Sequence, residues 1–207
     1  MTDETTGPYD IRTAGPEHLD GARSVMLDTF YQVFGYGYQP RWHADVIDLA
    51  DTYLRPERHA LFVATKGDEV VATTAVRAAA PNSPPHPRWL AERYPAASTA
   101  QLFRVYVRPE HRRNGLARAL VRRAVAFAAD QPDYRVVYLH TDTRVPGAEA
   151  FWRGVADLVH DPRDGDPHAS PTVHFEIPLP GRRPAHGDQI AADSARSGAS
   201  PRATSVR

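Results

Sequence analysis

Apolar side chains recur with two different periods along this chain, which predicts both helices and strands. The helical spacing predicts four helices, at residues 16–30, 42–53, 115–129 and 146–158. Pro16 and Pro146 stand near the start of two of them, where the fixed backbone angle of proline suits a first helical turn. Pro56 ends the second helix, because proline cannot continue it.

Runs rich in Val, Thr, Phe and Tyr predict six strands, at residues 9–13, 59–65, 70–78, 99–107, 135–141 and 172–179. Gly67 in the turn 66–69 joins two of them as a hairpin. The strand–helix–strand unit over 99–141 implies a parallel pair with a crossover, and the other strands look antiparallel. The expected class is α/β (α+β), a mixed, mostly antiparallel sheet of six to seven strands flanked by about four helices.

Residues 8–179 are expected to form one domain, with a disordered terminus on each side. Residues 1–7 are polar and acidic, and residues 180–207 are rich in Gly, Pro, Ser, Ala and Arg. Such segments bury too little apolar surface to offset their ordering entropy. Residues 81–98 hold five prolines and form a long connection. It is either a binding loop or a surface insertion.

Composition excludes several classes of protein. The 207 residues include no cysteine, which excludes a disulfide scaffold, a Cys-ligated metal and a cysteine nucleophile. The 25 basic and 25 acidic residues give zero net charge, which disfavours binding to nucleic acid. The ten histidines show no H-x-x-x-H spacing on a helix, so no metal is expected. The absence of a long apolar run or a signal-like N-terminus predicts a cytoplasmic protein without a membrane partner.

The most informative stretch is the turn between the strand ending at Val107 and the helix beginning near Gly115. The first N–H groups of a helix lack intrahelical partners and carry the positive end of its dipole. Glycine at this junction lets an anion approach the backbone, which suits a pyrophosphate. Arg112, Arg113 and Arg118 add charge there. The alternatives are a solvated basic face or a nucleic-acid patch.

This stretch resembles the acyl-CoA loop of the GNAT acyltransferases. Residues 112–117 (RRNGLA) match the family pattern R/Q-x-x-G-x-G/A, and residues 101–110 (QLFRVYVRPE) are similar to its strand E-I-K-R-L-Y-V-x-P-E. Residues 138–141 (YLHT) resemble its fifth strand, and residues 148–152 (AEAFW) its A-x-x-L-Y helix. The resemblance covers residues 9–178 and implies the GNAT fold, with the acyl-CoA loop between the fourth strand and the third helix.

The resemblance implies acetyl-CoA as the acyl donor. The backbone of Val105, Tyr106 and Val107 would pair with the pantetheine arm, and a backbone N–H near Val105 would stabilise the oxyanion. Trp152 would also contact the donor. The pyrophosphate would lie on the turn formed by Arg112, Arg113, Asn114, Gly115, Leu116, Ala117 and Arg118. Without cysteine, we expect direct transfer in a ternary complex.

Two positions depart from the family pattern. Gln101 replaces a glutamate that serves as base, and glutamine accepts no proton at neutral pH. Trp152 replaces a tyrosine that serves as acid. The candidate substitutes are His140, whose ordinary pKa suits a base, Tyr138 on the same strand face, and Tyr106. The alternative is that these three side chains are only packed.

The first two helices, their loop and residues 81–98 are expected to form the acceptor site. Tyr36 and Trp42 would supply aromatic walls and Asp45 a carboxylate, which suits a small cationic amine. Arg104 shares the strand face of Tyr106 and joins this group. The alternative is ordinary core and loop packing.

The expected function is N-acetylation of a small-molecule primary amine. One alternative is a protein N-acetyltransferase, although the 81–98 insertion would obstruct a peptide groove. The other is a catalytically silent CoA-binding or regulatory domain, which Gln101 and Trp152 favour. Relatives often dimerise, so a homodimer is a further expectation.

Overall fold

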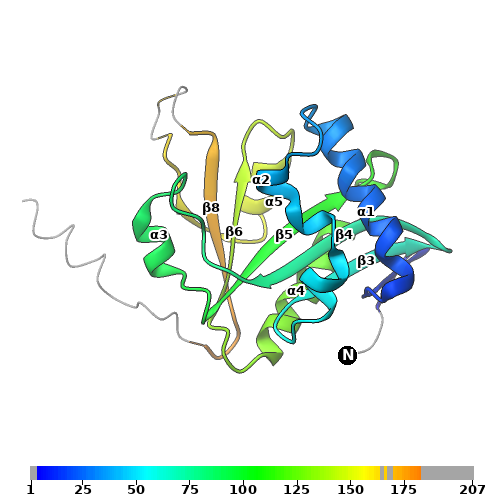
Figure 1. Cartoon of the computed structure of the whole chain (residues 1–207), viewed down its shortest axis with the longest axis horizontal. Helices are drawn as coiled ribbons and strands as arrows, with labels where there is room; N and C mark the ends of the chain where they lie inside the picture. Colours follow the sequence, from blue (N-terminus) through cyan, green and yellow to red (C-terminus); the bar gives the residue numbers. More distant parts are fainter. Residues whose placement is uncertain (1–3, 164–165, 167–169, 183–207) are drawn as a thin grey trace, which may run out of the picture.

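The computed structural model describes residues 4–163, 166 and 170–182, in which eight strands form one sheet with helices on both faces (Figure 1). The strands are β1 (Glu4–Thr6), β2 (Tyr9–Thr13), β3 (Ala60–Lys66), β4 (Glu69–Ala78), β5 (Thr99–Val107), β6 (Val136–Asp142), β7 (Asp157–His160) and β8 (Thr172–Pro178). The helices are α1 (Leu19–Asp28), α2 (Pro40–His43), α3 (Arg88–Arg93), α4 (Leu116–Asp130) and α5 (Ala148–Arg153).

The strand order is β1-β2-β3-β4-β5-β6-β8-β7, and every neighbouring pair is antiparallel except β5 and β6. This parallel pair is joined through α4, as the sequence predicted. Its pairing is short, because only Thr99–Gln101 align with Val136–Tyr138. Beyond that register the two strands diverge (Figure 1). The divergence leaves a gap in the sheet beside the N-terminus of α4.

A bulge in β5 sits next to this gap. Thr73 of β4 pairs with Tyr106, whereas Ala75 pairs with Phe103, so β5 holds one extra residue. Arg104 within it adopts the left-handed conformation, with φ 54°. The bulge changes the alternation of side chains along β5. Phe103, Arg104 and Tyr106 face the α1 side of the sheet.

The apolar core lies in two layers, one on each face of the sheet. On one face, α4 buries Leu116, Leu120 and Ala124 against strand residues that include Phe62 and Leu102. On the other face, α1 and the turn after it bury Val25, Met26 and Phe30 against Leu61 and Val63. Burial of each such large apolar side chain stabilises the fold by roughly 1.5–3 kcal/mol. The apolar positions that repeat with helical and strand periods in the sequence are therefore the ones that fill the two core layers.

The predicted second helix over 42–53 is wrong as one continuous element. Helix α2 stops at His43, and two short turns follow at Ala44–Val46 and Ala50–Leu54. The backbone carbonyl of Trp42 accepts a hydrogen bond from Arg104 at 2.7 Å rather than continuing a helical ladder. His43 turns inward, stacks on Phe30 and accepts a hydrogen bond from the Gln39 backbone N–H at 3.0 Å. Inward polar contacts thus end the helix early.

The structure also contains three elements that the sequence did not predict, β1, β7 and α3, and one predicted helix is shorter than expected. The sheet has eight strands rather than six to seven, because β1 forms within residues 1–7 and β7 replaces the end of the helix predicted over 146–158. That helix stops at Gly154, where glycine disfavours continuation. The proline-rich connection contains α3, whose Leu90 is fully buried. Of the tail, residues 180–182 are described, and Arg182 bonds backbone carbonyls at the end of α4. Residues 183–207 lie outside the described part.

Candidate active site

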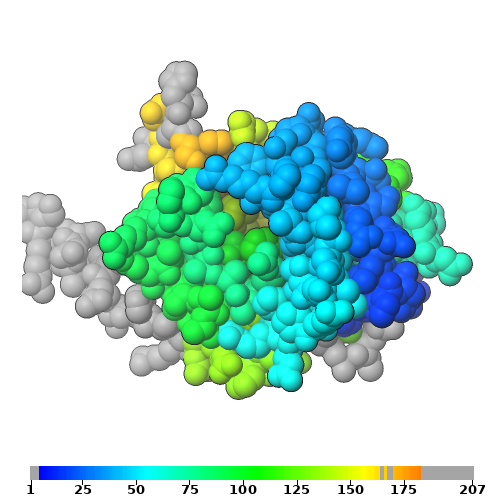
Figure 2. Space-filling model, viewed as in Figure 1, coloured from blue at the N-terminus to red at the C-terminus, as the bar shows by residue number. Residues whose placement is uncertain are grey.

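A cleft with a cavity volume of about 1860 Å³ crosses the sheet at the gap between β5 and β6. Figure 2 shows its opening as a hollow between the segment around α3 and the segment around α2. Its walls come from both faces of the sheet, with Val105 and Val107 on the α4 side and Phe103 and Tyr106 on the α1 side. We call the part beside α4 the donor half and the part beside α2 and residues 77–86 the acceptor half.

The N-terminus of α4 opens into the donor half. Gly115 caps it in the left-handed conformation, with φ 76° and only open space within 4 Å of the point where a side chain would begin. Leu116, Ala117 and Arg118 of the first turn line the cleft. Arg113 is also left-handed, with φ 64°, and this strain costs about 1–2 kcal/mol. A strained turn before a 15-residue helix presents unpaired backbone N–H groups to an anion.

Some polar side chains of this turn hydrogen-bond to backbone carbonyls and hold the turn in place, whereas two arginines have no carboxylate partner among the described residues. Arg112 donates from Nε to the Val107 carbonyl at 3.2 Å, which ties the turn to β5. Asn114 does not line the cleft and instead donates to the carbonyls of His111 and Arg112. Arg113 and Arg118 line the cleft, and within the described ranges no carboxylate lies at ion-pair distance from either. Their charge is therefore available to a phosphate.

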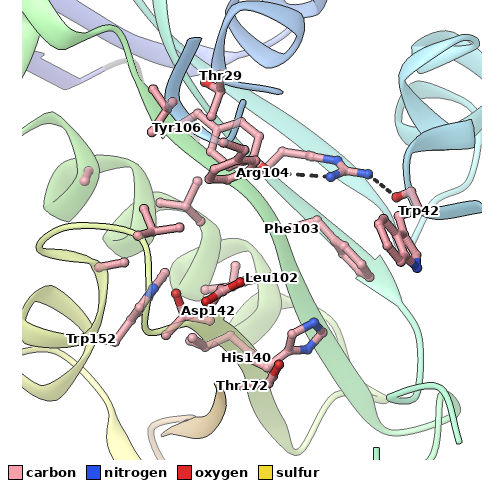
Figure 3. Close-up of a pocket in the computed structure, with 18 of the residues that line it drawn as sticks. Thr29, Trp42, Leu102, Phe103, Arg104, Tyr106, His140, Asp142, Trp152 and Thr172 are labelled. Carbon is pink, nitrogen blue, oxygen red and sulfur yellow. Dashed lines mark hydrogen bonds between the residues drawn. The ribbon is translucent and has the colours of Figure 1, made fainter. Parts of the chain in front are cut away.

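The remaining donor residues line the strand gap. Val105, Tyr106 and Val107 border it where β6 no longer pairs with β5. Trp152 of α5 is 6% exposed and closes the same end of the cleft, as Figure 3 shows. An open strand edge beside a cationic helix N-terminus fits a thioester with a long polar arm and a pyrophosphate. The residues present thus fit acetyl-CoA.

In the acceptor half, Arg104 and Asp45 form a buried ion pair. Arg104 Nε and Nη2 lie 2.9 and 2.5 Å from the two oxygens of Asp45, and Tyr53 donates to the same carboxylate at 2.5 Å. The exposed fractions of the two charged side chains are 9% and 6%. Burial opposes ionisation of Asp45, but the hydrogen bonds and charge of Arg104 outweigh it and lower the Asp45 pKa. Figure 3 shows Arg104 reaching toward Trp42.

This ion pair changes the prediction of a cationic acceptor site. Asp45 lines the cleft, but Arg104 and Tyr53 already occupy its oxygens. The carboxylate that was expected to meet a cationic amine is neutralised within the protein. Tyr36 and Trp42 do lie at the mouth, where they are 47% and 60% exposed. The aromatic walls are in place, whereas the free negative charge is not.

Three histidines gather at the inner end of the acceptor half. His140 of β6 is exposed to the cleft, and its ring centre lies 4.5 Å from that of His86 and 5.9 Å from that of His174. The protein packed around this cleft position displaces part of the water from the ring, and this desolvation, followed by the charges of His86 and His174, lowers the pKa of His140. His140 is therefore neutral at physiological pH and can accept a hydrogen bond, but it is a weaker base than the sequence implied.

The two candidate tyrosines occupy different surroundings. Tyr138 is fully buried, does not line the cleft, and shares a 2.7 Å hydrogen bond with Nδ1 of His174. Burial raises the pKa of Tyr138, so it is no ready proton donor to the cleft and holds His174 in place instead. Tyr106 does line the cleft, with its hydroxyl 3.4 Å from Nη1 of Arg104.

The histidine cluster predicts an acid-sensitive fold. Burial is the first cause that lowers the pKa of His86 and of His174, the latter to about 4. The unfolded chain binds protons near pH 6.5, whereas these folded residues do so only at lower pH. The free energy of unfolding is therefore unaffected by these histidines above pH 6.5, and it decreases as the pH falls from 6.5 toward 4, because protonation then favours the unfolded chain. Thermal melts across this window should show a decline that a His174→Asn variant makes shallower. An equal slope in both proteins would contradict it.

Sequence reasoning missed two polar residues that line the acceptor half, Arg77 and His86, and also the buried His174. Arg77 was visible as the lone charged residue inside the apolar run 70–78. His86 had no signal beyond its place in the proline-rich connection. His174 is brought to His140 by the register of β8 against β6. Among residues 4–163, 166 and 170–182, no group of His, Asp or Glu is arranged to hold a metal ion.

Comparisons with known proteins agree with this geometry. The acetyltransferase (GNAT) family profile matches residues 23–155. N-acetyltransferase 8B of Rattus norvegicus is 35% identical over 113 residues, which cover 55% of this chain and 46% of the rat protein. N-acetyltransferase 8 of Mus musculus is 36% identical over 110 residues, or 53% and 43% of the two chains. The chain thus spans about half the length of the curated relatives it matches.

Solved structures share the fold at low sequence identity. A GNAT acetyltransferase from Staphylococcus aureus Mu50 superposes with a TM-score of 0.60 at 15% identity, covering 83% of this chain and 99% of that one. The PaiA N-acetyltransferase of Thermoplasma acidophilum, in complex with coenzyme A, has a TM-score of 0.58 at 13% identity, covering 86% and 99%. YncA of Salmonella typhimurium, with acetyl-CoA, has a TM-score of 0.59 at 12% identity, covering 86% and 98%. None of the helices described here is both long and apolar enough to cross a bilayer.

Proposed function

Because this chain belongs to the acetyltransferase (GNAT) family, we propose that it moves an acetyl group from acetyl-CoA to a primary amine of a small molecule. One observation carries the proposal. The gap between β5 and β6 and the open N-terminus of α4 meet in a single cleft. Two of the similar structures hold coenzyme A or acetyl-CoA, which supports the same donor here.

The proposed roles follow from position in the cleft. Bound acetyl-CoA supplies an activated thioester carbonyl. The N–H groups of the α4 N-terminus, with Arg113 and Arg118, hold the pyrophosphate. The backbone at the β5 bulge, where Arg104 and Val105 fall outside the ladder to β4, donates to the carbonyl oxygen as charge develops. Direct transfer then needs an amine that has lost its ammonium proton: the C–N bond forms as the C–S bond breaks, and the proton that the nitrogen loses passes through water to the departing thiolate of CoA.

Proton removal in this proposal falls to water near His140 rather than to a carboxylate. Gln101 stands at the usual glutamate position and cannot accept the proton. His140 is neutral and reached from the cleft, so it can orient the amine or a water by accepting a hydrogen bond. Trp152 can donate a hydrogen bond to the departing sulfur but cannot deliver a proton.

These departures favour a second candidate, a CoA-binding domain without catalytic activity. The two are separated by incubating the protein with acetyl-CoA and a panel of primary amines, then measuring free thiol and the mass of each amine. The proposed function predicts thiol release matched by an acetyl mass gain on some small amines. Binding of acetyl-CoA without any such transfer would favour the silent domain. Transfer to peptides alone would favour a protein acceptor.

Assembly and location stay predictions. A homodimer is proposed by resemblance alone, and a cytoplasmic location is proposed from the apolar pattern and the polar N-terminus of the sequence. The segment from residue 79 to 98, with α3 inside it, borders the acceptor half through Asn82, Pro85 and His86. A wall at this place leaves less room for a folded protein than for a small amine, which supports the small-molecule acceptor.

A further inference from the structure

Two polar side chains of the acceptor half face each other, and each has a buried atom without a hydrogen-bond partner in the described residues. Arg77 of β4 and Gln101 of β5 are directly opposed in the ladder, and both line the cleft. Gln101 is 2% exposed, and its Oε1 has no hydrogen-bond partner in the part of the chain that the structure describes. Arg77 Nε is likewise buried and unpartnered. Unpaired buried polar groups are rare, and each one here borders a cavity that admits a ligand.

Arg77 carries the uncompensated charge that lies beside Gln101, whereas Arg41, the other acceptor-half arginine of the described residues without a carboxylate partner, is exposed on α2. Its guanidinium carbon lies 5.1 Å from the ring centre of Phe103, which precedes the β5 bulge. The charge of Arg77 contributes to the lowered pKa of Asp45, but the oxygens of that carboxylate are already hydrogen-bonded to Arg104 and Tyr53. The other carboxylate of the cleft, Asp142, is bound by Arg144 at 2.6 Å. Within the described ranges, no carboxylate pairs with Arg77.

The glutamine at position 101 keeps this charge free. Opposite charges on directly opposed strand residues attract, so a glutamate at 101 would pair with Arg77. The neutral amide does not, and it offers hydrogen bonds instead. The departure from the family pattern therefore has a physical consequence besides the loss of a base. It leaves a guanidinium ready for a carboxylate that enters with the acceptor.

We propose that Arg77, with the amide of Gln101 beside it, binds the carboxylate of the acceptor, and that the acceptor is a free α-amino acid with an apolar side chain. This inference rests on the proposed acetyl transfer. A free amino acid places its amine and carboxylate a few bonds apart, which matches the nearness of Arg77 to the bulge through Phe103. Tyr36 and Trp42 give the apolar side chain a surface at the mouth. A protein N-terminus has no carboxylate beside its amine and would leave Arg77 unpaired.

The test compares phenylalanine with phenylalaninamide, which has the same shape but lacks the carboxylate. Calorimetry on the protein saturated with CoA measures binding without any turnover, and thiol release from acetyl-CoA measures transfer. We expect phenylalanine to bind about 10- to 100-fold more tightly than the amide, the range for a hydrogen bond to a charged group. Equal binding of the two compounds, or tighter binding of the amide, would overturn the inference.

Variants assign the preference to Arg77. Arg77→Gln should bring phenylalanine down to the affinity of the amide and leave the amide unchanged. Arg88→Gln on the exposed face of α3 removes an arginine outside the cleft and should keep the preference. Gln101→Glu, which retains the guanidinium but pairs it, should lower the preference even if Arg77→Gln fails to fold. A preference that survives in both cleft variants would contradict the assignment.

The two readouts separate this inference from the proposed function. Acetyl transfer to amines without a preference for the carboxylate would overturn the Arg77 assignment and leave the transferase standing. A carboxylate preference in binding with no transfer to any amine would overturn the proposed function and leave Arg77 as a carboxylate site.

Discussion

A Gly115→Glu variant is expected to lose acetyl-CoA binding by at least about 100-fold while keeping its fold. Gly115 is left-handed at the N-terminus of α4, so any side chain there costs about 1–2 kcal/mol of strain. The space around it is open, so no clash adds to that cost. Glutamate also brings a carboxylate to the N–H groups that we assign to the pyrophosphate. Calorimetric titration of acetyl-CoA into the variant measures the loss.

Two variants separate charge from strain in this test. Gly115→Ala adds the strain alone and should weaken binding much less. Gly67→Glu adds the same strain and charge in the β3–β4 turn, where the glycine has φ 59° and no neighbour within 4 Å. It should bind acetyl-CoA like the unmodified protein. Equal losses in Gly115→Ala and Gly115→Glu would show that the anion site has been misplaced.

An Asp45→Asn variant is expected to be the most destabilised of the point variants considered. The change leaves Arg104 buried without its partner charge, and breaking a buried pair by removing one partner costs about 3–5 kcal/mol. At this chain length the melting temperature should fall by roughly 10 °C. Because the folded-state pKa of Asp45 is lowered, its contribution is present above the unfolded pKa and lost as the pH falls through the folded value.

Asp51→Asn provides the matched control. Asp51 pairs with Arg55 at the surface, where the two side chains are 49% and 75% exposed, and such a pair is worth about 0–1 kcal/mol. Its melting temperature should change little. If Asp45→Asn and Asp51→Asn had the same melting temperature, the buried ion pair of Asp45 with Arg104 would stabilise the fold no more than a surface pair does. That result would contradict the account.

Most helices and strands could be predicted because the period of apolar residues can be determined from the sequence alone. The strand over Thr99–Val107 and the helix after Gly115 were predicted almost to the residue, since each has a clear period and a glycine marks the junction between them. The strand β7 was missed, since four residues show too little alternation to stand out. The helix α3 was missed because the prolines around it indicated a loop.

The acceptor half was harder to predict because its character depends on contacts between distant residues. Asp45 and Arg104 are 59 positions apart, and only the fold shows that their charges cancel. The bulge at Arg104 turns Phe103 and Arg104 to one face of the sheet. Its left-handed residue is not a glycine, so the sequence gives no signal of it. Arg77 and Gln101 become neighbours through strand register alone. The local motif therefore predicted residues that lie together along the donor half, and their contact with a donor stays a prediction, whereas the carboxylate expected in the acceptor half is paired within the protein.

The most direct test is calorimetric titration of acetyl-CoA into the unmodified protein. The account predicts one site per chain with a micromolar dissociation constant, weakened by added CoA as a competitor. That result would establish a donor site, and its loss in Gly115→Glu would place the donor at the N-terminus of α4 and leave only the acceptor to be established. No heat of binding over a wide range of protein and ligand concentration would contradict the account, since the GNAT fold would then have lost its donor site.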